Sequence, residues 1–101
     1  MPVKIATIED TNPTHQAALR GFANRLARLR ASKQMSQGDL AAKIGARRGS
    51  MTIWEKGSTI PDLATICVLA EVLEVSATWL ALGVGASPTS FTTVEERIAQ
   101  V

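Results

Sequence analysis

The chain has 101 residues, of which 46% are hydrophobic and 4% aromatic, and its net charge is +2. This length allows one hydrophobic core but not two, and the composition favours a small all-α bundle over a β-sandwich. His15 and Cys67 are the only histidine and the only cysteine, so no disulfide, metal cluster or nucleophile–base set can be assembled within the chain. We therefore expect no enzyme activity, metal, cofactor or small-molecule effector, and a location in the reducing cytoplasm.

An N-terminal arm precedes the first predicted helix. Residues 1–12 carry apolar side chains without a helical period, which is consistent with a disordered segment or with a strand added to a partner. Asn12 and Pro13 then form a helix-start signal, with Asn12 as the N-cap. A helix to about Ser32, which Gly21 could split, is predicted because apolar residues recur at helical spacing at Leu19, Phe22, Leu26 and Leu29.

Two short amphipathic helices follow, separated by a turn at Gly45. Ser36 caps the first of them, and Asp39 three residues on gives a weaker form of the capping box. The apolar face of this helix consists of Leu40, Ala41 and Ile44. Gly45 is suited to the left-handed conformation that ends a helix.

The second short helix is predicted over residues 48–55, stops near Gly57, and directs Met51 and Trp54 inward. Helices this short are not stable alone in water, so each must bury its apolar face against the other and against its neighbours. A compact helix–turn–helix with an exposed basic start of its second helix has a shape that fits the major groove of DNA.

Two further helices complete the predicted bundle. Asp62 caps the first, and Ser76 caps a shorter one that ends at Gly83. The buried face of the first is predicted to consist of Leu63, Ile66, Cys67, Leu69, Ala70 and Leu73. Residues 84–90 are predicted to be a linker, and residues 92–98 one last helical turn or two.

The apolar run over residues 63–82 raises the question of a membrane span. Glu71 and Glu74 lie in its middle, where charges are costly in a bilayer. We therefore interpret the run as two core helices, with no membrane partner.

The charges are segregated along the chain. Residues 20–56 carry nine basic residues against Asp39 and Glu55, a net of +7, and residues 57–101 carry five acidic residues against Arg97, a net of −4. A basic half and an acidic half indicate that one side of the protein faces a polyanion. A solvated face on the first helix would explain part of this pattern, but it explains less well the residues around the second short helix, Arg47, Arg48 and Lys56.

Between Phe22 and Gly83, roughly 60% of the chain, the sequence resembles the five-helix DNA-binding domain of phage repressor and Cro proteins, also called the Xre type. The motifs agree in register: Ser-Gln opens the first short helix, Trp-Glu-Lys-Gly closes the second, and Leu-Glu-Val-Ser and Trp-Leu follow. The resemblance implies an all-α, five-helix lambda-repressor-like bundle over residues 13–83. It leaves an N-terminal arm at 1–12 and a linker and helical tail at 84–101.

The resemblance places the helix over residues 48–55 in the major groove. The base-reading residues that it implies are Arg48, Gly49, Thr52 and Ile53. Arginine can bind guanine in a bidentate manner, and threonine and isoleucine can contact a thymine methyl group. The residues implied to contact the DNA backbone are Gln37, Arg47, Ser50, Lys56 and Ser58.

Three further points follow from the register. Arg30 and Glu55 match positions that the family pairs in a partly buried salt bridge, so we expect them to have a structural role. Arg47 stands where the family usually has a capping Ser or Thr, which predicts a looser helix start. Gly49 lacks a side chain at a base-reading position, so Arg48 or DNA shape would carry more of the discrimination.

The function implied is that of a sequence-specific transcriptional regulator, with a repressor favoured, that binds a pseudo-palindromic operator in double-stranded DNA as a homodimer. The predicted dimer surface consists of Trp79, Leu82, Phe91, Val94 and Ile98. Phe91 and Ile98 could instead fold back onto their own core. Two other functions stay open: an antitoxin-like protein that binds DNA and a partner protein, and a scaffold module without DNA contact.

Overall fold

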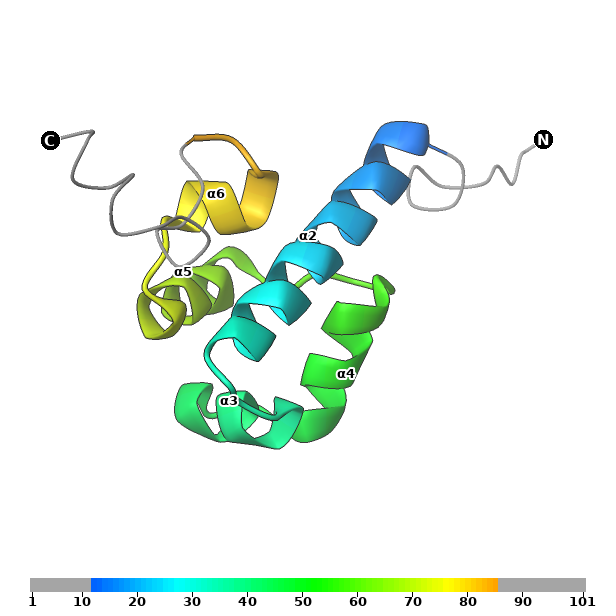
Figure 1. Cartoon of the computed structure of the whole chain (residues 1–101). Coiled ribbons are helices and arrows are strands. Elements are labelled where there is room, and N and C mark those ends of the chain that lie inside the picture. Colours follow the sequence, from blue (N-terminus) through cyan, green and yellow to red (C-terminus); the bar gives the residue numbers. More distant parts are fainter. Residues whose placement is uncertain (1–11, 86–101) are drawn as a thin grey trace, which may run out of the picture.

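Five helices follow one another over residues 12–85, the part of the chain that the computed structural model describes (Figure 1). They are α2 (Pro13–Ser32), α3 (Gln37–Ile44), α4 (Arg48–Lys56), α5 (Leu63–Leu73) and α6 (Ala77–Leu82). The all-α class and the predicted order of the helices are thus confirmed. The predicted arm up to residue 11, and the predicted tail with Phe91, Val94 and Ile98, lie outside the described residues.

Side-chain caps account for where most of these helices begin. In each predicted case the cap oxygen accepts a backbone N–H three residues further on, at Asn12, Ser36, Asp62 and Ser76. The capping box of α3 is complete, because the Asp39 carboxylate also accepts the Ser36 N–H at 3.0 Å. α2 runs unbroken through Gly21, so the expected split at that glycine does not occur.

The core lies where four shorter helices pack against α2, which crosses the molecule diagonally (Figure 1). α2 contacts α4 on one side and α6 on the other, and α3 joins α4 to α5. The largest fully buried side chains come from every helix: Phe22, Leu26, Leu29, Leu40, Met51, Leu69, Leu73 and Leu80. α4 is therefore fixed from two directions, by α2 and by α3.

The predicted buried face of α5 is partly wrong. Leu63 is 73% exposed and Cys67 is also exposed, whereas Ile66, Leu69, Ala70 and Leu73 are buried. Leu63 and Cys67 are four residues apart and therefore form their own stripe on the outer side of the helix. Among the described residues, no helix combines the length and the apolar character that a bilayer crossing requires.

Trp79 is buried rather than part of an accessible dimer surface. Its side chain is 8% exposed, and the guanidinium carbon of Arg25 lies 5.9 Å from the centre of its ring. Arg25 Nε donates to the Leu80 carbonyl at 2.9 Å, and Nη2 donates to the Ala81 carbonyl at 3.0 Å. Arg25 thus links the end of α6 to α2 and covers the indole, so this partly buried arginine is engaged in contacts within the fold.

Gly83 permits this contact. It ends α6 with φ +76°, and a Cβ at this position would lie 2.7 Å from Arg25 Nη1. A larger residue would have to displace the guanidinium and adopt a backbone conformation that L side chains rarely take.

We expect the stability of this fold to decrease in acid. Hydrogen bonds from Ser36 hold the pKa of Asp39 below its ordinary value, and hydrogen bonds from Thr65 do the same for Asp62. A carboxyl with a lowered folded-state pKa stabilises the fold above its unfolded pKa of about 4, and this contribution is lost as the pH falls through the folded-state pKa. Urea unfolding followed by circular dichroism, between about pH 5 and pH 2, measures the effect.

The matched control is the double variant Asp39→Asn/Asp62→Asn. Asparagine can still accept a capping hydrogen bond but does not titrate. The free energy of unfolding of this variant should change less with pH than that of the wild type. An identical pH profile for both proteins would contradict the assignment.

Candidate nucleic-acid interface

α4 has one side in the core and the other in solvent. Met51 is fully buried, and Trp54 packs against the core beside it. On the opposite side Arg48 and Gly49 are exposed, and Ile53 is 45% exposed. This is the orientation that the sequence predicted, with Met51 and Trp54 directed inward.

The turn between α3 and α4 fixes how the two helices meet. Gly45 ends α3 with φ +74°, and the Ala46 N–H donates to the Ala41 carbonyl at 2.9 Å. Arg47 then stands at the N-cap of α4 without a side-chain cap hydrogen bond, as its replacement of Ser or Thr predicted. The start of α4 therefore leaves backbone N–H groups without a side-chain acceptor.

The predicted ion pair between α2 and α4 is confirmed. Arg30 Nε donates to Glu55 Oε2 at 2.7 Å, and Arg30 Nη2 donates to Glu55 Oε1 at 2.9 Å. The Glu55 side chain is only 6% exposed. Arg30 Nη1 also donates to the Met35 carbonyl at 2.7 Å. The hydrogen bonds to Glu55 raise the pKa of the Arg30 guanidinium above its ordinary value.

Glu55 also organises two of the predicted contact residues. Gln37 Nε2 donates to Glu55 Oε1 at 3.0 Å, and the Thr52 hydroxyl donates to Gln37 Oε1 at 2.8 Å. The resulting chain of hydrogen bonds, which we call the Arg30–Thr52 network, consists of Arg30, Glu55, Gln37 and Thr52. The sequence analysis treated Gln37 and Thr52 as separate contacts, and no spacing in the sequence indicated that they bond to each other.

Two glycines near Arg48, Gly38 and Gly49, leave the surface there without side chains of their own. A Cβ on Gly49 would meet nothing within 4 Å, so packing does not require a glycine there. A Cβ on Gly38 would lie 4.0 Å from Arg48 Cδ, which shows that the Arg48 side chain passes close to the start of α3. Arg48 is thus a long exposed side chain beside Gly49, which has none.

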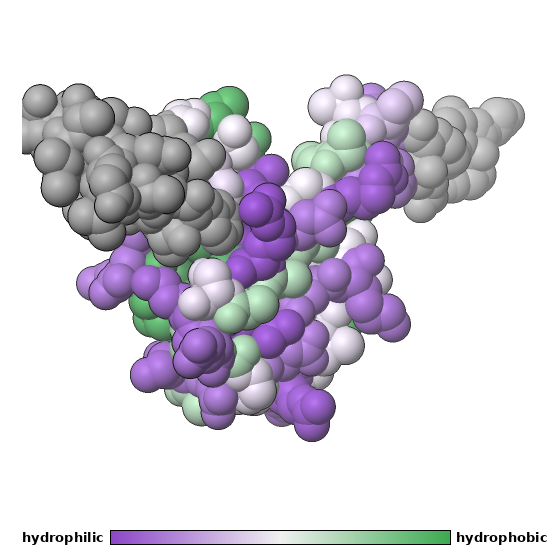
Figure 2. Space-filling model, viewed as in Figure 1, coloured by the Kyte–Doolittle hydropathy of each residue, from purple (hydrophilic) through white to green (hydrophobic). Residues whose placement is uncertain are grey.

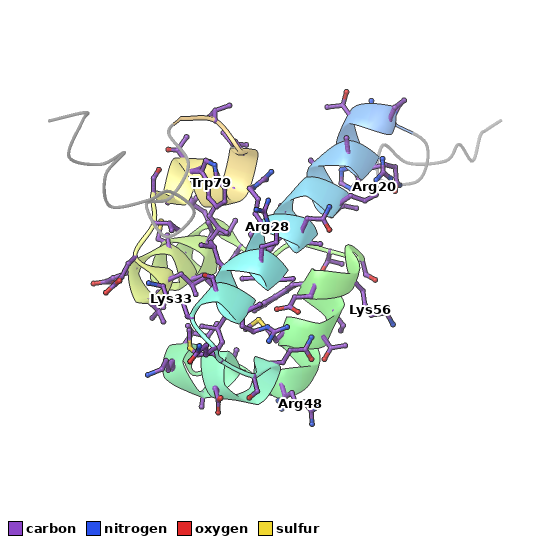
Figure 3. The ribbon with its side chains drawn as sticks, viewed as in Figure 1. Arg20, Arg28, Lys33, Arg48, Lys56 and Trp79 are labelled. Carbon is purple, nitrogen blue, oxygen red and sulfur yellow. The ribbon has the colours of Figure 1, made fainter. Side chains whose placement is uncertain are left out.

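The basic segment of residues 20–56 does not form a single face. Arg25 and Arg30 are used in contacts within the fold, and Lys33 forms an ion pair with Glu74 at 3.0 Å. In Figure 3, Arg48 and Lys56 point away from the two ends of α4, whereas Lys33 lies toward α5. Part of the basic segment is therefore engaged within the fold, whereas Arg48 and Lys56 are exposed at the two ends of α4.

Arg20 is an addition to the predicted site. Figure 3 shows it on α2, on the same side of the molecule as Lys56. A Cβ on Gly57 would lie 3.9 Å from Arg20 Cα, so this part of α2 borders the loop that follows α4. The exposed residues Arg20, Lys56 and Ser58 therefore border one edge of α4. Helical periodicity alone did not distinguish Arg20 from the other arginines of α2.

The other predicted backbone contacts lie on or beside the two short helices. Arg47 and Ser58 are exposed, and Ser50 and Gln37 are partly exposed. Leu82, on α6, is 68% exposed and is the accessible member of the predicted dimer surface among residues 12–85.

These features define a helix-turn-helix protein, and a family comparison agrees. A helix-turn-helix family model matches residues 26–80, more than half of the chain. The chain therefore belongs to the Xre-like helix-turn-helix family of transcriptional regulators.

Two known proteins illustrate the likeness. The chain is 34% identical over 62 residues to a Bacillus subtilis protein described as the uncharacterized HTH-type transcriptional regulator YqaE, covering 61% of this chain and 53% of that protein. The chain thus spans about half the length of this relative. A crystal structure of the hypothetical transcription factor NHTF from Neisseria superposes with a TM-score of 0.61 at 22% identity, covering 100% of this chain and 97% of that one. At this identity the second likeness shows the fold alone.

We expect Arg30→Ala to destabilise the fold by about 2–3 kcal/mol, somewhat less than a fully buried pair costs, because part of the guanidinium faces solvent. The loss arises because Glu55 stays buried without its partner. Lys33→Ala is the matched control, since its partner Glu74 is largely exposed, and it should cost less than about 1 kcal/mol. Urea unfolding of both variants measures the difference, and equal losses would contradict a structural role for Arg30.

Proposed function

We propose that the protein is a sequence-specific DNA-binding transcriptional regulator that inserts α4 into the major groove. The observation that carries the proposal is the two-sided geometry of α4. Burial of Met51 leaves Arg48, Gly49, Thr52 and Ile53 together on the outer side. Helix-turn-helix proteins reach base edges with a short helix that a second, packed helix holds in this orientation.

Base reading would depend mainly on Arg48. Its guanidinium can donate two hydrogen bonds to guanine O6 and N7, and Gly49 beside it lets the backbone approach the bases. Ile53 and the methyl group of Thr52 offer apolar contact to a thymine methyl group. The long side chain of Arg48 and the low surface at Gly49 support this assignment.

Contacts to the DNA backbone would surround these residues. The start of α3 at Gln37 and the start of α4 at Arg47 and Ser50 point donors toward one strand. Lys56 and Ser58, with Arg20 beside them, would meet phosphates at the other end of α4. This arrangement places positive charge on both flanks of the reading residues, which supports a duplex as the partner.

Repression as a homodimer on a pseudo-palindromic operator is the form of regulation that we propose. One reading helix covers few base pairs, and two half-sites a helical turn apart multiply the discrimination. A second copy could pair through Leu82, which is exposed beside a groove of about 270 Å³ lined by Thr14, Ala17, Ala18, Arg25, Ala81 and Leu82. Figure 2 shows the molecule hollowed between α6 and the first turns of α2.

Arg48→Ala should relax the preference at one base pair of each half-site, at a cost of about 1–3 kcal/mol. Lys56→Ala should instead weaken binding to all sequences alike and reduce the slope of log affinity against log salt by about 1. Selection of bound sites from a random DNA pool, followed by titrations at several salt concentrations, separates the two effects. Lys33→Ala, on the side of α2 toward α5, is the control that should change neither.

If Arg48→Ala leaves both the selected sequence and the affinity unchanged, then α4 is not the reading helix. Binding that does not weaken as salt rises would exclude phosphate contacts altogether.

Leu82→Asp should weaken self-association by about tenfold or more, because a charge would be buried in the proposed dimer contact. The control is Leu63→Asp, since Leu63 is equally exposed but lies on α5, outside the groove. Sedimentation equilibrium of the two variants measures the monomer–dimer constant. Dissociation by Leu63→Asp alone would place the interface on α5 instead.

A further inference from the structure

We infer that Thr52 presents only an acceptor to DNA, because both hydrogen-bond neighbours of its hydroxyl are themselves acceptors, and that it therefore distinguishes amino bases from keto bases. The inference rests on the proposed function, because the polarity of Thr52 is read only if α4 lies in the major groove. It adds a specificity rule for one residue, and the rule follows from the direction of three hydrogen bonds.

The first step is the orientation of the Gln37 amide. A carboxylate accepts hydrogen bonds and cannot donate one, and Arg30 donates an N–H to each oxygen of Glu55, at 2.7 and 2.9 Å. The Gln37 atom that lies 3.0 Å from Glu55 Oε1 must therefore be its NH₂ group. The reverse orientation would place two acceptor oxygens against each other. Glu55 thus determines which end of the amide faces which neighbour.

The second step is the direction of the Thr52 hydroxyl. The other end of the amide, Gln37 Oε1, lies 2.8 Å from Thr52 Oγ1 and can only accept. The second neighbour of Thr52 Oγ1 is the Arg48 carbonyl at 3.2 Å, which also can only accept. A hydroxyl has one hydrogen, so whichever oxygen receives it, Thr52 Oγ1 has only lone pairs left for a third partner.

The third step is the match to the bases. In the major groove, adenine N6 and cytosine N4 donate hydrogen bonds, whereas guanine and thymine present acceptors at O6 or O4. A residue that can only accept should bond to adenine or cytosine and should repel the keto oxygen of guanine or thymine. Thr52 is partly exposed and lies on the same side of α4 as Arg48 and Ile53, so its oxygen can reach one base of the half-site.

The experiment compares the sites that the wild-type protein, Thr52→Val and Thr52→Ser select from a random DNA pool. Valine has the shape of threonine but no acceptor, and serine keeps the hydroxyl. We expect one half-site position with adenine or cytosine favoured by about tenfold over guanine or thymine in the wild type. This preference should be lost in Thr52→Val and kept in Thr52→Ser. Thr78→Val, an exposed substitution on α6, is the matched control and should select the wild-type sequence.

The outcomes separate this inference from the proposed function. If Thr52→Val selects the same sites as the wild type, or if the position that depends on Thr52 favours guanine or thymine, the inference is overturned while DNA recognition by α4 stands. If the wild type selects no sequence, the proposed function itself fails.

Discussion

The burial of Met51 is the constraint from which the rest of the interface follows. α4 has nine residues and no side-chain N-cap, so it would not be stable as an isolated helix. It is held because Met51 is fully buried and Trp54 packs against the same core. Since a helix has a fixed rotation per residue, this burial also determines which side chains face outward. The exposed side of α4 therefore consists of the residues that the hydrophobic contact leaves outside. These residues can vary without loss of the fold.

The Arg30–Glu55 pair adds a second, directional constraint. Burial orients α4 as a body, but it does not determine how individual hydrogen bonds point. Glu55 does so because a carboxylate can only accept, and its oxygens are shared by Arg30 on α2 and Gln37 on α3. A desolvated pair of this kind is weak evidence for net stability, since the cost of removing both charges from water offsets much of their attraction. Its value here lies in the orientation that it imposes on the Gln37 amide.

The sequence predicted the structural features that depend on neighbouring residues in the chain. It missed the contacts between residues that are far apart in the sequence. Helical period and capping residues are local, so the five helices and their caps were predictable. α5 is apolar on most sides, and periodicity could not decide that Leu63 and Cys67 face solvent. The sequence analysis assigned Trp79 to the surface, because Arg25, which packs over its ring, lies far away in sequence. The positions of the candidate site followed from register, but the bond between Gln37 and Thr52 joins two helices and leaves no pattern in either.

The first turns of α2 lie outside the residues that the family model matches, because that match begins at residue 26 and α2 begins at Pro13. These turns bury Leu19, whose carbonyl would lie 3.8 Å from a Cβ on Gly57, so they support the loop that follows α4. A loop backed by a helix loses less conformational entropy on binding than a free loop does. If Lys56 and Ser58 contact a phosphate as proposed, they would do so from this supported position, with the charge of Arg20 beside them. The extension would thus contribute to DNA binding at the C-terminal end of α4.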